Sequence, residues 1–192
     1  MNQAPFEENR RSAERIVERA GLGEILDVQP ILGGRNNRIY RLSTSEGPDV
    51  ALKAYFKHPA DSRDRLGTEF VFLEWCEELG IENVPKAIGC DPAAALGLYS
   101  FLSGRQPNSA DLVDKAADQI LAFVNTLNDR DQWPRMPSLP DASEACFSPE
   151  QHLATIDHRL CRLLGELGPN ALDRDVERFL SKVVQPLWET MK

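Results

Sequence analysis

Two neighbouring stretches near the start of the chain decide its fold: ILGGRNNRIY at residues 31–40 and VALKAYF at residues 50–56. In the first, apolar residues on either side of Gly33 and Gly34 predict two strands joined by a loop. In the second, Lys53 lies within an apolar run that has the composition of a strand. Because glycine has no Cβ atom, backbone N–H groups in such a loop can approach an anion closely. A glycine loop followed one strand later by a fixed ammonium group is one way to hold the phosphates of a nucleotide.

The same loop carries Asn36 and Asn37, whose side chains tolerate tight turns and can donate hydrogen bonds. A plain hairpin turn between two strands explains these residues equally well. The loop matches neither the P-loop pattern nor the dinucleotide fingerprint, because a strand follows it where those motifs require a helix.

Glu69 is the residue that distinguishes a nucleotide-binding loop and lysine from a plain hairpin. It lies in a predicted helix at residues 63–79, and its neighbours one and two turns away are apolar, namely Leu66, Phe72, Leu73 and Cys76. A carboxylate on the apolar side of a helix is costly to ionise unless a cation pairs with it. The order of strand and helix brings Lys53 within reach, so we expect a Lys53–Glu69 ion pair. A Lys53 side chain that extends from an edge strand into solvent is the alternative, and Glu74 is the rival partner.

The remaining pattern predicts an α+β fold. A helix around residues 13–20 precedes strands at residues 25–32, 38–43, 50–56, 86–90 and 96–102, with the helix at residues 63–79 between the third and fourth strands. Helices follow around residues 111–128, from residue 149 to 167, and from about residue 176, where Pro186 is expected to kink or end the last one.

Composition narrows the classes of function. The 192 residues carry a net charge of -8, which argues against a nucleic-acid partner, and no apolar run approaches the roughly 20 residues that cross a membrane. Residues 1–11 lack the apolar core of a signal peptide, and the four cysteines form no C-x-x-C pair. These features predict a cytoplasmic protein with reduced cysteines.

In this order and spacing, the first 104 residues resemble the aminoglycoside phosphotransferase and choline kinase-like family. The matching pieces are the residue 32–42 loop and strand, Leu52-Lys53, Glu69 with Leu73, the Gly80 to Pro85 turn, and a hinge from Leu98 to Gly104. The resemblance implies a protein-kinase-like small lobe at residues 1–103, with a five-stranded antiparallel sheet and one αC-type helix. Residues 104–192 would then be the helical start of an incomplete large lobe.

The resemblance also implies ATP with Mg²⁺ and transfer of the γ-phosphoryl group to the hydroxyl of a small molecule. Residues carried over from the family assign Gly33, Gly34, Asn36 and Asn37 to the phosphates. Lys53 would contact the α- and β-phosphates, and Glu69 would hold Lys53. The backbone near Ser100 and Leu102 would bind adenine.

One departure from the family is expected to limit activity. The family's His-x-Asp catalytic loop with its downstream Asn, and its magnesium-binding Asp, have no counterpart before Lys192. We therefore expect the metal ligands beyond Lys192, no catalytic residue in this chain, and little activity from the chain alone. Uncovered apolar faces of the large-lobe helices would favour self-association. The alternatives are a stand-alone nucleotide-binding or regulatory module without catalysis, and a scaffold in which Lys53 and Glu69 have only a structural role.

Overall fold

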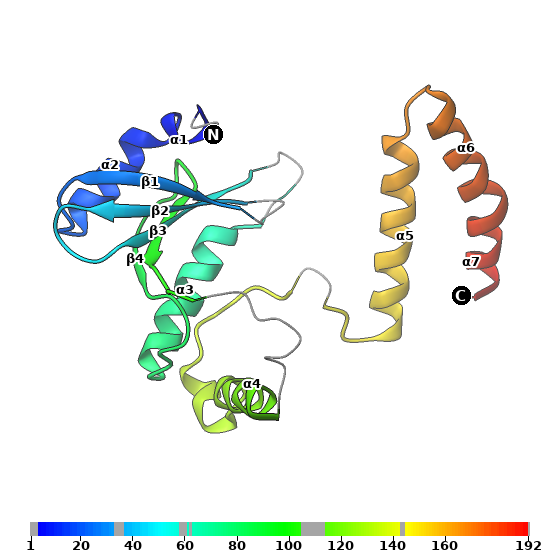
Figure 1. Cartoon of the computed structure of the whole chain (residues 1–192). Coiled ribbons are helices and arrows are strands. Elements are labelled where there is room, and N and C mark those ends of the chain that lie inside the picture. Colours follow the sequence, from blue (N-terminus) through cyan, green and yellow to red (C-terminus); the bar gives the residue numbers. More distant parts are fainter. Residues whose placement is uncertain are drawn as a thin grey trace. The chain divides into compact units, whose positions relative to one another are not determined.

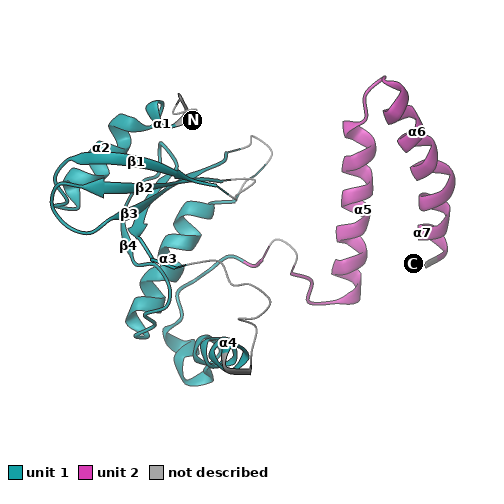
Figure 2. Ribbon diagram, in the orientation of Figure 1, with its two compact units in different colours: residues 1–140 teal, residues 141–192 magenta. Residues whose placement is uncertain are grey.

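The structure is a computed structural model that describes residues 4–32, 37–57, 61, 63–104, 114–142 and 145–191. The chain forms two compact units, residues 1–140 and residues 141–192 (Figure 2). Among the described residues, no helix combines the length and the apolar character needed to cross a membrane.

The first unit is built on a five-stranded antiparallel sheet (Figure 1). Its strands are β1 (Ile25–Ile31), β2 (Asn37–Thr44), β3 (Val50–Tyr55), β4 (Ala87–Asp91) and β5 (Leu96–Ser100). Their order across the sheet is β1-β2-β3-β5-β4, and each neighbouring pair is antiparallel. The predicted α+β class with its five-stranded sheet is confirmed. The fifth strand ends at Ser100, two residues earlier than predicted.

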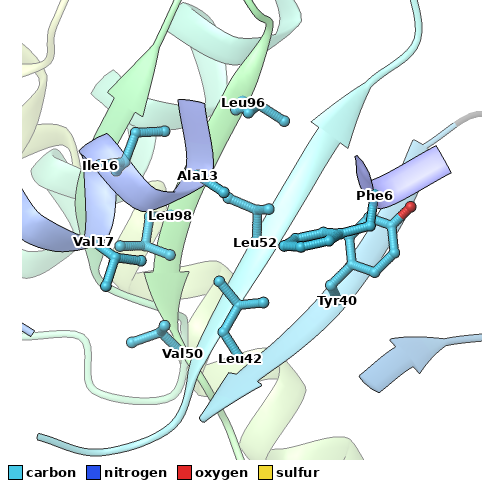
Figure 3. Packing of buried hydrophobic residues seen from close by; sticks show 10 residues of the cluster. All are labelled: Phe6, Ala13, Ile16, Val17, Tyr40, Leu42, Val50, Leu52, Leu96 and Leu98. Carbon is cyan, nitrogen blue, oxygen red and sulfur yellow. The ribbon is translucent and has the colours of Figure 1, made fainter. Parts of the chain in front are cut away.

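One face of the sheet packs against two N-terminal helices, α1 (Ala4–Glu7) and α2 (Arg10–Arg19). Residues of α2 share a buried apolar cluster with β2, β3 and β5; the cluster comprises Phe6, Ala13, Ile16, Val17, Tyr40, Leu42, Val50, Leu52, Leu96 and Leu98 (Figure 3). The ring of Phe6 meets that of Tyr40 edge-on, with centroids 5.3 Å apart. This cluster uses the even-numbered residues of β3 and β5, so the odd-numbered residues point to the opposite face.

The opposite face packs against α3 (Arg65–Glu78), the predicted helix that carries Glu69. Asp64 caps its N-terminus by accepting a hydrogen bond from the Gly67 N–H at 2.9 Å. Gly80 follows its C-terminus with a φ of 72°, a backbone conformation that glycine adopts without strain. A second buried cluster joins this helix to the sheet through Tyr55, Leu66 and Ala95, with Phe70 and Cys90 packed against it.

The first unit also contains α4 (Asp114–Leu127) and a short 3-10 helix at Arg130–Arg135. The predicted start of α4 at residue 111 lies outside the described residues.

The second unit contains α5 (Pro149–Glu166), α6 (Ala171–Phe179), η3 (Leu180–Val184) and α7 (Gln185–Met191). Ser148 caps α5 by accepting a hydrogen bond from the Gln151 N–H at 3.2 Å.

Pro186 does not end the last helix, because α7 continues through this residue to Met191. Whether it kinks the helix stays a prediction. The residues just before it, Leu180–Val184, form a π-helical turn, in which the Gln185 N–H bonds back to the Leu180 carbonyl. Proline has no N–H to bond to the carbonyl one turn earlier. The wider π turn rearranges the backbone hydrogen bonds there, so the helix passes the proline without ending.

Candidate functional site

The face of the sheet that meets α3 carries a lysine–glutamate ion pair. Lys53 lies in the middle strand β3, where it is opposite Ile39 on one side and Gly97 on the other. Its Nζ atom lies 2.5 Å and 2.8 Å from the two carboxylate oxygens of Glu69 in α3. The predicted ion pair therefore forms, between residues that are 16 positions apart in sequence.

The apolar pattern of α3 explains why Glu69 is the partner. Leu66 and Leu73, three residues before and four residues after Glu69, are both 6% exposed and anchor that side of the helix to the protein. The rival Glu74 is exposed. Another carboxylate of the same helix, Glu77, instead pairs with Lys86 at 2.7 Å.

The two ion pairs of α3 differ in their surroundings. The side chains of Lys53 and Glu69 are 19% and 34% exposed, whereas those of Lys86 and Glu77 are 61% and 50% exposed. Water and salt screen a partly buried pair less, so its attraction is stronger and the loss of one partner costs more. The ammonium of Lys53 also lies 4.8 Å from the centre of the Tyr55 ring, a cation–π distance.

Two tyrosines that the sequence did not single out complete this face. The hydroxyl oxygens of Tyr55 and Tyr99 are 2.7 Å apart and buried, so one hydroxyl donates a hydrogen bond to the other. Burial is the main cause that raises the pKa of both phenols, to about 12 for Tyr99. The negative charge of Glu69 raises the pKa of each further.

The other predicted site residues divide between described and undescribed parts of the chain. Gly33, Gly34 and Asn36 lie outside the described residues, so their assignment to the phosphates stays a prediction. Asn37 is described and begins β2, where its Oδ1 atom accepts a hydrogen bond from the Phe56 N–H at 3.3 Å.

The two predicted hinge residues lie at the end of β5 and just beyond it. Ser100 is the last residue of that strand, and its N–H donates to the Lys86 carbonyl at 2.9 Å while its hydroxyl accepts from the Lys86 N–H at 2.8 Å. Leu102 lies just beyond the strand and its side chain is 48% exposed. Whether either residue binds adenine stays a prediction.

Within the described part of the chain, no group of three or more His, Cys, Asp or Glu residues is placed to hold a metal ion. The acidic residues of this face are committed elsewhere, since Glu69 pairs with Lys53 and Asp61 pairs with Arg63 and Arg65. Where the metal ligands lie therefore stays a prediction.

The fold and this ion pair define a mixed α+β protein whose central strand presents a lysine to a helix carboxylate. Comparison with protein families matches residues 27–190 to the phosphotransferase enzyme family, and the chain belongs to that family. The match extends over both compact units and includes Lys53 and Glu69.

Among solved structures, the chain is similar to a protein described as a "putative fructosamine-3-kinase" from Thermobifida fusca. The two are 23% identical, with a TM-score of 0.36, over 49% of this chain and 32% of that chain. The chain thus spans about a third of the length of that relative. No curated protein sequence matches the chain.

Proposed function

We propose that this chain is the ATP-binding portion of a phosphotransferase that moves the γ-phosphoryl group of ATP to a hydroxyl of a small molecule. The observation that carries the proposal is the Lys53–Glu69 ion pair, which joins β3 to α3 in a chain of the phosphotransferase enzyme family. A partly buried lysine that is held by a carboxylate presents a fixed positive charge. That arrangement suits binding to the α- and β-phosphates of a nucleotide.

Each residue has a limited task in this proposal. Lys53 neutralises phosphate charge, and Glu69 fixes the direction of the ammonium group. The loop that contains Gly33, Gly34, Asn36 and Asn37 covers the phosphates with its backbone N–H groups. Because the N–H of Ser100 is already bonded to Lys86, adenine recognition at the hinge would use the Ser100 carbonyl and the backbone of Leu102.

Catalysis by the chain alone is a separate question. Phosphoryl transfer depends on positioning and on charge neutralisation, which Mg²⁺ supplies when it is bound. The His-x-Asp motif of the family does not occur in the 192 residues. We therefore propose that the chain binds ATP and transfers little phosphate by itself. The second candidate, a nucleotide-binding or regulatory module without catalysis, would use the same Lys53–Glu69 pair and predicts ATP binding without transfer.

The binding proposal is tested by calorimetric titration of ATP into the wild-type chain and into Lys53→Met and Lys86→Met variants. Both variants remove one lysine that pairs with a carboxylate of α3, so they are matched in charge. We expect the first to weaken ATP binding about tenfold or more, since it removes a charge-assisted phosphate contact, and the second to have little effect. Equal effects of the two variants, or no binding by the wild-type chain, would contradict the proposal.

The transfer step is tested with radiolabelled ATP and a panel of small hydroxyl compounds, including amino sugars, amino alcohols and sugars. Labelled product at enzymatic rates would show that the chain catalyses without further residues. Saturable ATP binding without product would favour the module.

We also propose that the chain self-associates through apolar side chains of the helices that follow the sheet. Large apolar residues of α4, α6 and α7 are exposed, namely Ile120, Leu121, Val124, Leu172, Phe179 and Leu187. Exposed apolar side chains that gather on helices commonly mark contact surfaces. The contact partner that we propose is a second copy of this chain.

A further inference from the structure

The hydroxyl groups of Tyr55 and Tyr99 meet beside the Lys53–Glu69 pair. Tyr55 follows Lys53 by two residues in β3, so both side chains extend from the same face of the sheet. Tyr99 follows Gly97 by two residues in β5, and Gly97 is directly opposite Lys53. The register of the two strands therefore places both phenols around the lysine.

The tyrosine rings are held firmly in this position. Tyr55 is 8% exposed and Tyr99 is 3% exposed. A Cβ atom at Gly97 would lie 2.4 Å from the Tyr99 hydroxyl oxygen and 2.7 Å from its ring, so the phenol occupies the space next to the glycine. Phe70 of α3 packs against Tyr99 with ring centroids 6.0 Å apart. The hydroxyl pair is thus a rigid feature of the sheet.

Each hydroxyl of the tyrosine pair can donate one hydrogen bond. Two hydroxyls carry two protons, and the bond between the oxygens uses one of them. The other proton needs an acceptor, because an unpaired buried donor is costly. Glu69 is the carboxylate beside the pair, because the Lys53 ammonium lies 2.5 Å from a Glu69 oxygen and 4.8 Å from the centre of the Tyr55 ring. In keeping with this proximity, the negative charge of Glu69 raises the pKa of both phenols.

We propose that the Tyr55–Tyr99 hydroxyl pair is a positioning element, which holds the Glu69 carboxylate and through it directs the Lys53 ammonium toward the phosphates of a nucleotide. This inference rests on the proposed function. The tyrosines do not touch the nucleotide; they act on Glu69, which is one-third exposed and would otherwise be shared between Lys53 and water. A fixed carboxylate lowers the entropy cost of fixing the long lysine side chain.

The first test needs no nucleotide. A double-mutant cycle compares the free energy of unfolding of the wild-type chain, Tyr55→Phe, Glu69→Met and the combined variant. If the hydroxyl pair acts on Glu69, the effect of Tyr55→Phe should fall by at least half when Glu69 is absent. Tyr40→Phe is the matched control, because Tyr40 is a buried tyrosine of the same sheet that belongs to the cluster on the other face. Its effect should be unchanged by Glu69→Met, and additive effects of Tyr55→Phe and Glu69→Met would overturn the inference.

The second test separates positioning from packing. The Tyr55→Phe/Tyr99→Phe double variant removes both hydroxyls and leaves neither unpaired. If the hydroxyls have only a structural role, this variant should therefore regain most of the stability that a single variant loses. The measurement is the ratio of the affinities for ATP and adenosine, since only ATP reports on the phosphate contact of Lys53. We expect this ratio to fall by about threefold to tenfold in the double variant, the size of one hydrogen bond's net contribution, with adenosine affinity little changed.

The outcomes of the two tests are distinct. An unchanged ratio in the double variant, alongside a reduced ratio in Lys53→Met, would overturn the positioning role while leaving the proposed function intact. A wild-type chain that binds neither compound would overturn the proposed function, and the double-mutant cycle would still decide whether the hydroxyl pair holds Glu69.

Discussion

A Cβ atom added at Gly97 would lie 2.4 Å from the hydroxyl oxygen of Tyr99, so the tyrosine occupies the space that any other residue at position 97 would need. Because Gly97 is opposite Lys53 in the sheet, this close approach also determines what lies next to the lysine. Glycine in the interior of a strand normally weakens it, and a position where a side chain crosses the backbone closely is one that needs glycine.

The first prediction follows from this contact. Gly97→Ala should destabilise the chain by about 1–3 kcal/mol, because the buried Tyr99 ring cannot move aside without leaving Tyr55 and Phe70. Gly165→Ala is the control, since a Cβ at that helical position meets no atom within 4 Å and should be neutral or slightly stabilising. Chemical denaturation of both variants measures the difference. Similar midpoints for Gly97→Ala and the wild-type chain would show that the phenol has room to move.

The second prediction compares the two ion pairs of α3. Lys53→Met should lower the free energy of unfolding by about 1–3 kcal/mol, because it leaves Glu69 partly buried without its cation. Lys86→Met should change it by about 0.5 kcal/mol or less, because Lys86 and Glu77 are both mostly exposed. Denaturant titrations of the two variants under the same conditions test this. A larger loss of unfolding free energy for Lys86→Met would show that the exposure of the two ion pairs does not determine their contributions to stability.

The third prediction concerns alkaline pH. All three tyrosines of the chain have a raised pKa, chiefly through burial, whereas an unfolded tyrosine titrates near 10. A pKa that is higher in the folded state means that the stabilisation is complete below about pH 10 and is lost as the pH rises toward the folded value, about 12 for Tyr99. Phenolate absorbance should therefore appear together with unfolding. The same titration in strong denaturant is the control and should show a midpoint near 10. Phenolate formation near pH 10 with the circular dichroism unchanged would contradict the burial of these rings.

A fourth prediction tests self-association. Replacing Leu172, Phe179 and Leu187 together with glutamine should reduce any concentration-dependent association, because these side chains are 72%, 57% and 59% exposed. Glu177→Gln, at an exposed position of the same helix as Phe179, is the control and should leave association unchanged. Sedimentation velocity over a range of concentrations measures the effect. A wild-type chain that stays monomeric throughout that range would exclude the proposed contact.

Much of the fold and the central ion pair could be predicted from sequence because their signals are local. Alternation of apolar residues places Lys53 on one face of β3, and the apolar neighbours of Glu69 place that carboxylate toward the sheet. The Tyr55–Tyr99 contact could not be found this way, because it joins residues 44 positions apart and depends on strand register. Gly97, a glycine inside a predicted strand, was the one local signal of a close approach beside Lys53.

Phe6 is the clearest case of a core residue hidden from sequence patterns, and it supplies the last prediction. It lies in a polar segment with no helical periodicity, yet it is 2% exposed, because α1 lays it against Tyr40 (Figure 3). Phe6→Ala should lower the free energy of unfolding by about 3–5 kcal/mol, through lost burial and the cavity left behind. Phe147→Ala makes the same chemical change at a side chain that is 74% exposed, and should cost about 0.5 kcal/mol or less. Denaturant titration of the two variants, followed by circular dichroism of the whole chain, compares them directly. If Phe6→Ala proved as mild as Phe147→Ala, α1 would not be part of the core, and the face of the sheet that it covers would be open to another partner.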